Sequence, residues 1–344
     1  MQILLAPDKF KGTLTAGEIA RAMERGVEAA GLDAGCTLLP IADGGEGTLD
    51  VLGQEGPAAL LPDGSFIVEM AATFAGASPT KEGSLRRSSF EAGRLIAQGL
   101  ASRDASSVVV AVGGTLSTDG GTGAAAACGW SFLDRRGRVL DGGGGRLSEL
   151  AEIVPPRRPT AKLPVIGACD VDVPLTGPRG SARMFGAQKG ATDEEIAILE
   201  EGLLNLEERM RLDLGYLTSE RSHQGAGGGM GAGLGAFFGA RLENGFDFVA
   251  ERIGLAEALS SADLVVTGEG RVDAQSLAGK APVRLASLAR ELGVPCLAIG
   301  GTVELSPEEL GSAGFAAAAG LGIGSPANLV SEAMARLLEG WFAP

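Results

Sequence analysis

Apolar residues in the first thirty positions change from a short continuous run to a helical repeat. Residues 2–6 (QILLA) form an apolar run of strand length. Further on, Thr15 and Glu18 have the spacing of a capping box, in which each side chain bonds the other residue's main-chain N–H. The apolar residues that follow recur every four positions and share one helix face: Ile19, Met23 and Val27. The pattern predicts a strand, a loop and a helix that begins at Thr15.

The same alternation of strand and helix returns near the end of the chain. A second strand is predicted over 36–41, and two further apolar strands over 264–267 and 296–299 are separated by a helical stretch. Strands that alternate with helices are typical of a parallel sheet with helices on both faces. We therefore expect an α/β fold with a doubly wound parallel sheet built from both ends of the chain.

The central region has a different texture, with long glycine tracts. Strands are predicted over 66–71, 108–112 and 165–169, and Ser88 with Glu91 and Thr192 with Glu195 have capping-box spacing ahead of two helices. We interpret this region as a second α/β domain, inserted into the first. The predicted domains are 1–55 plus 256–344 and, between them, 56–255, with the active site in the cleft between the two.

Composition excludes some classes of function. The formal net charge is −14, which argues against binding nucleic acid, since phosphate backbones need a basic surface. No apolar run approaches the length of a membrane span, no secretory leader precedes the first strand, and the four cysteines are widely separated without CxxC spacing. We expect a cytoplasmic protein with no membrane partner and with its cysteines in the core.

Three glycine turns carry carboxylates: one at residues 43–48 (DGGEGT), one at 117–123 (STDGGTG) and one at 267–273 (TGEGRVD). Glycines let the backbone approach an anion closely, and carboxylates can hold the Mg²⁺ that accompanies a nucleotide. The first turn follows a predicted strand, at the edge where parallel sheets bind ligands. The turns indicate phosphoryl transfer. No Walker motif is present, because Gly279 and Lys280 are followed by Ala281.

A further glycine-rich segment, residues 225–239, has two interpretations. It is either a loop that binds phosphate at a helix N-terminus or a site of close packing through small residues. The one histidine, His223, precedes it in a polar loop and is predicted to be a surface residue, which leaves acid–base chemistry to carboxylates. The candidates for the base are aspartates in or near the turns: Asp8, Asp43, Asp119, Asp170 and Asp273.

Five segments together resemble the glycerate kinase type I family. They are residues 6–16 (APDKFKGTLTA), 40–48 (PIADGGEGT), 168–177 (ACDVDVPLTG), 185–191 (FGAQKGA) and 267–273 (TGEGRVD), in the family's order. The resemblance implies ATP-dependent phosphorylation of D-glycerate with Mg²⁺, and a flavodoxin-like domain that carries an inserted α/β domain. The chain departs from the family's pattern at Thr118, Val173 and Ala187, which affects the expected substrate contacts.

The matched positions supply the predicted site residues. Lys11 and Arg271 are expected to act on the substrate carboxylate or the transferred phosphoryl group, and Asp43 and Asp119 are expected to be catalytic. Glu46, Glu269 and Asp273 are predicted metal ligands. Substrate and phosphate binding is assigned to the remaining positions: Asp8, Gly44, Gly45, Gly120, Gly121, Asp170, Lys189 and Lys280.

Several alternatives stay open at this point. The product is either 2-phosphoglycerate or 3-phosphoglycerate. The protein is otherwise a kinase of another small hydroxy acid, or a nucleotide-binding regulator that has lost turnover. The sequence leaves the oligomeric state open.

Overall fold

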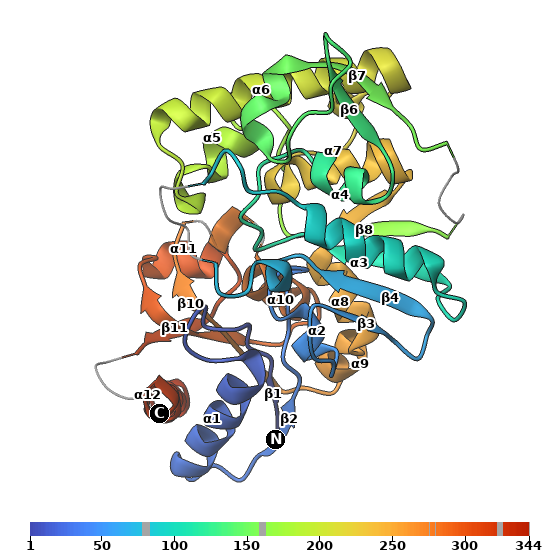
Figure 1. Ribbon diagram of the computed structural model, residues 1–344. Helices are drawn as coiled ribbons and strands as arrows, with labels where there is room; N and C mark the ends of the chain where they lie inside the picture. The colour runs from blue at the N-terminus through green and yellow to red at the C-terminus, as the bar shows by residue number, and fades with distance from the viewer. Residues whose placement is uncertain (78–82, 158–162, 275, 279, 322–325, 344) are drawn as a thin grey trace. The chain divides into compact units, whose positions relative to one another are not determined.

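The computed structural model describes residues 1–77, 83–157, 163–274, 276–278, 280–321 and 326–343. Within it the chain forms two compact units (Figure 1). Unit 1 contains Met1–Asp43, Asp50–Gly53 and Phe246–Pro344, and unit 2 contains Gly44–Leu49 and Gln54–Gly245. The acidic glycine turn at residues 43–48 thus begins in unit 1 and continues in unit 2.

Unit 1 is built on a five-stranded parallel sheet. Its strand order is β12-β11-β10-β1-β2, so β1 lies between the strand that follows it in sequence and a strand from the far end of the chain. Read by order of appearance this is the flavodoxin-like order 2-1-3-4-5, as predicted. The strands are β1 (Gln2–Leu5), β2 (Gly35–Leu38), β10 (Leu264–Val272), β11 (Cys296–Val303) and β12 (Ala317–Gly320).

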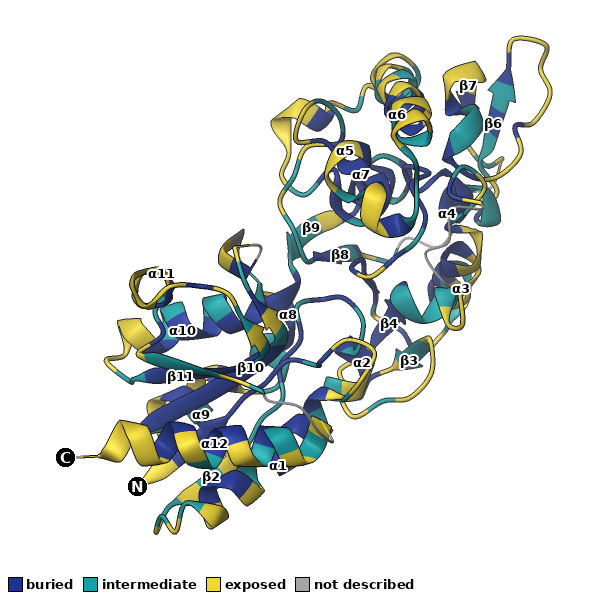
Figure 2. Ribbon diagram, turned by 90° about the vertical axis from the view of Figure 1, so that its left-hand side faces the viewer, coloured by how far each residue is buried: buried dark blue, intermediate teal, exposed yellow. Residues whose placement is uncertain are grey.

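Helices cover both faces of this sheet because successive strand residues point to opposite sides. Ile3 and Leu5 pack with α1 (Ala16–Ala29) and α12 (Pro326–Phe342). Leu4 packs into a second core with the helices of the other face: α9 (Leu255–Ser260), α10 (Ala281–Glu291) and α11 (Pro307–Ser312). In Figure 2 the helices α1 and α12 show dark, buried stripes beside exposed ones. Helix α8 (Gly245–Arg252) leads into this unit.

Unit 2 contains a mixed five-stranded sheet in the order β3-β4-β5-β8-β9, in which only the β3–β4 pair is antiparallel. Alternate valines of the central strands pack against α3 (Phe90–Ala101) and α7 (Ala226–Phe238). A second core lies between α6 (Asp193–Leu214) and a two-stranded sheet of β6 and β7. The strands are β3 (Ala58–Leu60), β4 (Ser65–Glu69), β5 (Ser107–Ala111), β6 (Ser131–Asp134), β7 (Leu150–Val154), β8 (Val165–Cys169) and β9 (Arg241–Asn244).

The α-helices that begin between residues 48 and 226 lie in unit 2 or, for the first of them, begin there. They are α2 (Thr48–Val51), α3 (Phe90–Ala101), α4 (Thr122–Ala127), α5 (Ser181–Phe185), α6 (Asp193–Leu214) and α7 (Ala226–Phe238). Short 3₁₀ turns join these elements at 71–74, 144–149, 187–189 and 218–220, and another lies in unit 1 at 276–278.

Two of the three predicted capping boxes are confirmed, at Thr15 with Glu18 and at Thr192 with Glu195. The third prediction was wrong. Helix α3 begins one residue later than that motif implies, with Ser89 as its N-cap and no side-chain cap bond. The Ser89 hydroxyl is turned away because it donates to Asp119 instead, at 2.9 Å. A tertiary bond has replaced the local one.

In the described part of the chain no helix is long and apolar enough to cross a membrane. The four cysteines are free thiols, three of them buried, and burial raises the pKa of Cys128 to about 11. Cys128, Cys169 and Cys296 are core residues, as predicted, whereas Cys36 is half-buried at the edge of the core beside α1.

Candidate functional site

The first group of predicted residues lies at the carboxyl edge of the unit 1 sheet. Asp8 follows β1, and its main-chain N–H donates to the Gly268 carbonyl at 2.8 Å, so it lies beside β10. Glu269 belongs to β10 itself. These two strands are the switch point of the flavodoxin-like order, where the crevice of such sheets forms. Chain order alone had not indicated that β1 and β10 are neighbours.

Asp8 is a buried carboxyl group among other charges. It is 7% exposed, and Lys9 Nζ lies 3.6 Å from Oδ1. Burial raises the Asp8 pKa to about 7; Lys9 opposes the rise, and the charges of Asp43 and Glu269 add to it. An aspartate with a pKa near neutrality can accept or release a proton under working conditions.

Glu269 is paired with Lys280 across the same edge. Lys280 Nζ lies 3.1 Å from Oε2 of Glu269, which is itself 5% exposed. Burial raises the pKa of Glu269, and the Lys280 charge opposes that rise. Among the described residues, Oε1 of Glu269 is buried without a hydrogen-bond partner. The predicted site residues Asp8, Asp43, Glu269 and Lys280 therefore interact within one unit.

Arg271 and Asp273 are placed differently. Arg271 is well exposed, and its guanidinium is 3.0 Å from Asp273 and 2.9 Å from Glu304. These carboxylates, with Glu304 first, raise the Arg271 pKa. Asp273 also closes a turn, since its Oδ1 accepts from the Ser276 N–H at 3.3 Å. Arg271 and Asp273, two of the predicted site residues, thus form an ion pair with each other. Lys11 is exposed in the turn that follows β1.

The second group lies at the carboxyl edge of the unit 2 sheet. A methyl group added to Gly113, just after β5, would lie 2.8 Å from the Cα of Gly45 and 2.9 Å from Oδ2 of Asp170. The Gly113 N–H donates to the Gly44 carbonyl at 3.2 Å. The turn at 44–46 thus packs against the ends of β5 and β8. Glu46 lies beside Gly114 at the same place.

A residue that the sequence analysis missed holds this turn. Glu69, at the end of β4, accepts from the N–H groups of Gly47 and Leu49, at 3.0 and 2.9 Å. It is 6% exposed. The sequence offered one signal, an acidic residue that ends an otherwise apolar strand (SFIVE).

Lys189 is a buried cation in unit 2. It is 7% exposed, and its Nζ donates to the Ser117 carbonyl at 2.7 Å. Burial lowers its pKa to about 8; the charges of Asp170 and Asp119 oppose that shift and Arg87 adds to it. The hydrogen bond to Ser117 goes to an uncharged main-chain oxygen, so it leaves the positive charge of Lys189 in place. A buried cation held in this way suits an anionic ligand.

Asp119, Gly120 and Gly121 form the turn beside Lys189, but their polar groups are already engaged. Gly120 N–H donates to the Gly228 carbonyl at 3.0 Å, and Gly121 N–H donates to Asp119 Oδ1 at 3.2 Å. Both glycines have positive φ, +61° and +75°. In this conformation the Gly121 N–H bonds within the turn and the Gly120 N–H bonds the glycine-rich segment ahead of α7. The phosphate-binding role of these two glycines stays a prediction.

The glycine-rich segment at 225–239 serves close packing, the second of its two interpretations. Gly227, Gly228 and Gly229 have left-handed backbone ahead of the regular part of α7. A methyl group on Gly228 would lie 2.1 Å from the Ser117 carbonyl oxygen. The segment therefore supports the 117–121 turn from behind.

His223 is more buried than predicted. Its side chain is 14% exposed, and Nδ1 lies 2.9 Å from the Val171 carbonyl. Its φ of +63° is the only positive value among the described non-glycine residues. The residue fastens the loop that carries Asp170 and so has a structural contact, not a free surface position.

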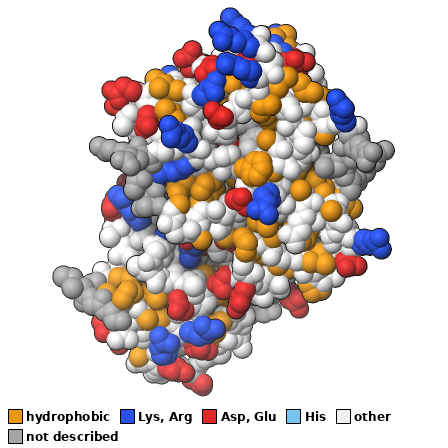
Figure 3. Space-filling model, in the orientation of Figure 1, with side chains coloured by type: hydrophobic (Ala, Val, Ile, Leu, Met, Phe, Trp, Pro, Cys, Tyr) orange, Lys and Arg blue, Asp and Glu red, His pale blue; other side chains and the backbone are white. Residues whose placement is uncertain are grey.

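Charges elsewhere are dispersed. On the face that Figure 3 shows, Lys and Arg side chains lie among acidic and apolar ones. No group of three or more His, Cys, Asp or Glu side chains in the described residues is arranged to hold a metal ion. Mg²⁺ in nucleotide sites commonly binds one or two carboxylates, with phosphates and water as its other ligands. The carboxyl edge of each sheet carries carboxylates that suit this arrangement.

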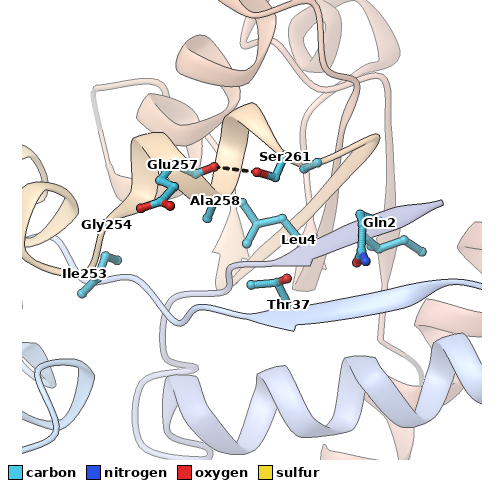
Figure 4. A pocket seen from close by; sticks show the side chains of 10 residues that line it. Gln2, Leu4, Thr37, Ile253, Gly254, Glu257, Ala258 and Ser261 are labelled. Carbon is cyan, nitrogen blue, oxygen red and sulfur yellow. Dashed lines mark hydrogen bonds between the residues drawn. The ribbon is translucent and has the colours of Figure 1, made fainter.

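A cavity of about 390 Å³ lies between strands β1 and β2 of unit 1 and helix α9 (Figure 4). Gln2, Leu4 and Thr37 line it from β1 and β2, opposite Ile253 and Ala258. Ser261 there donates to the Glu257 carbonyl at 3.1 Å. Asp8, Asp43 and Glu269 are not among the residues that line this cavity.

Known proteins resemble this chain along nearly its whole length. The model of the glycerate kinase family matches residues 3–339. The chain belongs to the glycerate kinase family. The members of this family are phosphotransferases with an alcohol group as acceptor, and the resemblance stated from the motifs is confirmed.

Individual relatives cover most of both chains. A glycerate kinase of Halalkalibacterium halodurans is 36% identical over 327 residues, 88% of this chain and 85% of that protein. The glycerate 2-kinase of Escherichia coli is 36% identical over 329 residues, 88% and 86%. A crystal structure from Salmonella typhimurium LT2, of a provisionally named glycerate kinase 2, has a TM-score of 0.77 at 31% identity and covers 99% of this chain and 97% of its own.

Proposed function

We propose that this protein transfers the γ-phosphoryl group of ATP to D-glycerate with the help of Mg²⁺. The observation that carries the proposal is the match to one family of kinases along nearly the whole chain. The name of the E. coli relative, a glycerate 2-kinase, supports the 2-hydroxyl as acceptor, so we propose 2-phosphoglycerate as the product.

Lys189 is the cation that we assign to an anionic group of the reactants. Its burial supports this role, because an ammonium group in low dielectric attracts an anion more strongly than an exposed one does. One of the three N–H groups of its ammonium donates a hydrogen bond to the Ser117 carbonyl, which fixes the direction of the side chain. The negative charge of Asp170 raises the Lys189 pKa and so favours the charged form of the ammonium group. Removing the Lys189 charge is expected to destabilise the transition state more than the bound substrates.

Asp8 is the carboxylate that we assign to proton transfer. Phosphoryl transfer to an alcohol needs a group that accepts the hydroxyl proton, and such a base is most effective when its pKa is near the working pH. Asp8 has a pKa raised to about 7 and lies at the switch point of the unit 1 sheet. Asp43, whose charge contributes to that rise, remains a second candidate on the same edge.

Glu269 is the predicted metal ligand whose surroundings fit Mg²⁺ best. It is buried at the carboxyl edge, and its Oε1 has no hydrogen-bond partner in the described residues. Asp273 is engaged with Arg271, which makes it a weaker ligand. Mg²⁺ held there would supply positive charge that neutralises the transferred phosphoryl group. Lys280, 3.1 Å from Glu269, would add a second positive charge beside it.

Phosphorus NMR of the reaction products tests the proposal. Purified protein is incubated with Mg·ATP and D-glycerate, with L-glycerate and hydroxypyruvate as control substrates. A 2-phosphoglycerate resonance is expected, and 3-phosphoglycerate would correct the assigned hydroxyl. If ATP binds but no phosphoester forms, other small hydroxy acids are tested next; failure with all of them would favour a regulator without turnover.

A further inference from the structure

The Asp119 carboxylate is enclosed by donors from its own unit. It is 1% exposed. Oδ2 accepts from the Ser89 N–H at 2.8 Å, from the Ser89 hydroxyl at 2.9 Å and from the Gly123 N–H at 3.2 Å, while Oδ1 accepts from Gly121. Two carboxylate oxygens offer about four acceptor positions. To take a substrate proton, Asp119 would have to give up one of these bonds.

Ser89 is the main partner of Asp119 and joins two helices. It is the N-cap residue of α3 and is 1% exposed. Its hydroxyl donates to Asp119 and accepts from the N–H of Ala124, in the first turn of α4, at 2.9 Å. The first turns of α3 and α4 are therefore fastened through one hydroxyl and one carboxylate.

This pair is linked by hydrogen bonds to Lys189. Two residues before Ser89, the Arg87 guanidinium donates to the Lys189 carbonyl at 2.5 Å. Lys189 Nζ donates to the carbonyl of Ser117, two residues before Asp119. The segments 87–89, 117–123 and 187–189 are thus joined by hydrogen bonds, one of which is made by the Lys189 ammonium group.

We propose that Ser89 and Asp119 are positioning residues. Ser89 fixes the Asp119 carboxylate, and together they hold the 117–121 turn so that the Ser117 carbonyl directs the Lys189 ammonium group. The inference rests on the proposed function for its kinetic consequence, though not for the coupling between the two side chains. It reassigns Asp119, which the motif alone had placed among the catalytic groups.

The test compares Ser89→Ala, Asp119→Asn and the double variant. Ser84→Ala is the matched control, since Ser84 is another buried serine of the same unit, and its hydroxyl has no partner among the described residues. We measure Tm, and also kcat/KM against pH with Mg·ATP and D-glycerate. Each single variant is expected to lose roughly 10- to 100-fold in kcat/KM. Each should keep the acid limb of the profile, which is the fall of kcat/KM at low pH when the catalytic base becomes protonated. The control should match the wild type.

Energetic coupling between Ser89 and Asp119 tests the proposed structural role of the pair. Because both single variants break one network, the double variant should be no slower and no less stable than the worse single variant. Additive losses in Tm would overturn the proposal. It would also be overturned if Asp119→Asn removed the acid limb while Ser89→Ala kept wild-type kinetics, since Asp119 would then act on the proton directly.

Two outcomes are kept apart by this design. A wild type that does not phosphorylate glycerate counts against the proposed function alone, because the Tm cycle still reports the coupling. If Asp119→Asn does not fold, Ser89→Ala decides on its own: unchanged kcat/KM and Tm overturn the proposal, and reduced values with the acid limb kept support it.

Discussion

Lys189 donates a 2.7 Å hydrogen bond from Nζ to the main-chain carbonyl of Ser117, 72 positions earlier in the chain. A main-chain acceptor offers a partial charge, so the bond directs the ammonium group without neutralising it. The charges of Asp170 and Asp119 raise the Lys189 pKa, but they counter only part of the effect of burial. The cation is therefore held in place with its charge available.

Replacing Lys189 by methionine should remove this charge while it keeps most of the side chain's volume. We expect kcat/KM to fall by about 10²- to 10³-fold, the range seen when a preorganised electrostatic group is lost. Initial rates with Mg·ATP and D-glycerate check this. Arg183→Met, on an exposed cation of the same unit, is the control. Wild-type rates in Lys189→Met would show that the ammonium group has no part in the reaction.

The activity of the wild type should decline on the alkaline side near pH 8. Burial lowers the Lys189 pKa to about 8, so the free protein loses this positive charge as the pH rises through that value. The limb should appear in kcat/KM, and in kcat it should move to higher pH because a bound anion stabilises the charged form. A pH series in buffers of constant ionic strength measures both. A flat kcat/KM up to pH 9.5 would contradict the assignment.

Asp8→Asn should change the pH dependence of stability. The Asp8 pKa is raised from 3.8 to about 7, so the folded state keeps a proton that the unfolded state releases. The free energy of unfolding therefore falls as the pH rises from about 4 to 7. The Asp8→Asn variant does not titrate at this position. Its free energy of unfolding should therefore rise relative to that of the wild type by on the order of 2–4 kcal/mol between pH 4 and pH 8. Hydrogen exchange of the β1 and β10 amides reports on it.

The exposed residue Asp33 provides the control for that experiment. Asp33→Asn should follow the wild type at every pH. Parallel curves for Asp8→Asn and the wild type would mean that Asp8 is ionised in the folded protein at low pH, and would remove it as the proposed base.

Gly231→Ala should destabilise unit 2 although alanine is the better helix former. A methyl group there would lie 2.0 Å from the His223 carbonyl oxygen, which belongs to the backbone and cannot turn away. We expect a loss of about 2–3 kcal/mol. Trp130 fluorescence in a Trp341→Phe background follows it, because Trp130 packs on Phe237 of α7 with ring centroids 5.1 Å apart.

Gly17→Ala is the matched substitution in α1. The space around Gly17 is open, with nothing within 4 Å of an added methyl group. Helix propensity then acts alone, so the variant should gain up to about 1 kcal/mol. Similar effects at both positions would argue against the close packing of α7.

Periodicity predicted the elements well where they rest on local pattern. The helix that begins after Thr15 and the strand at 165–169 were correct, and Ile19, Met23 and Val27 are all buried. Strands β10 and β11 continue well past their predicted ends. Glycines there had the appearance of a loop, but they allow close approach: a methyl group on Gly301 would lie 2.4 Å from the Gly270 carbonyl.

The site was less predictable than the fold because its partners come from distant segments. The motifs named Lys189 and Asp8, but not their burial, which is what shifts each pKa. Ser89 and Glu69 carry no motif, and their bonds to Asp119 and to the 47–49 backbone exist only in the folded unit. The N–H groups of Gly120 and Gly121, which the motif suggested for a phosphate, bond the Gly228 carbonyl and Asp119 in the folded unit.

The sheet of unit 1 is assembled from the two ends of the chain, and Ile3 pairs with Leu264. On the ribosome, β1 and β2 emerge first, yet the strand that lies between them and β11 is synthesised only after all of unit 2. For roughly ten seconds or longer the apolar residues of β1 wait without that neighbour. Unit 2 can complete its own sheet in this interval, so the nascent chain should fold from its middle outward, and β1 is the segment that a chaperone would have to shield.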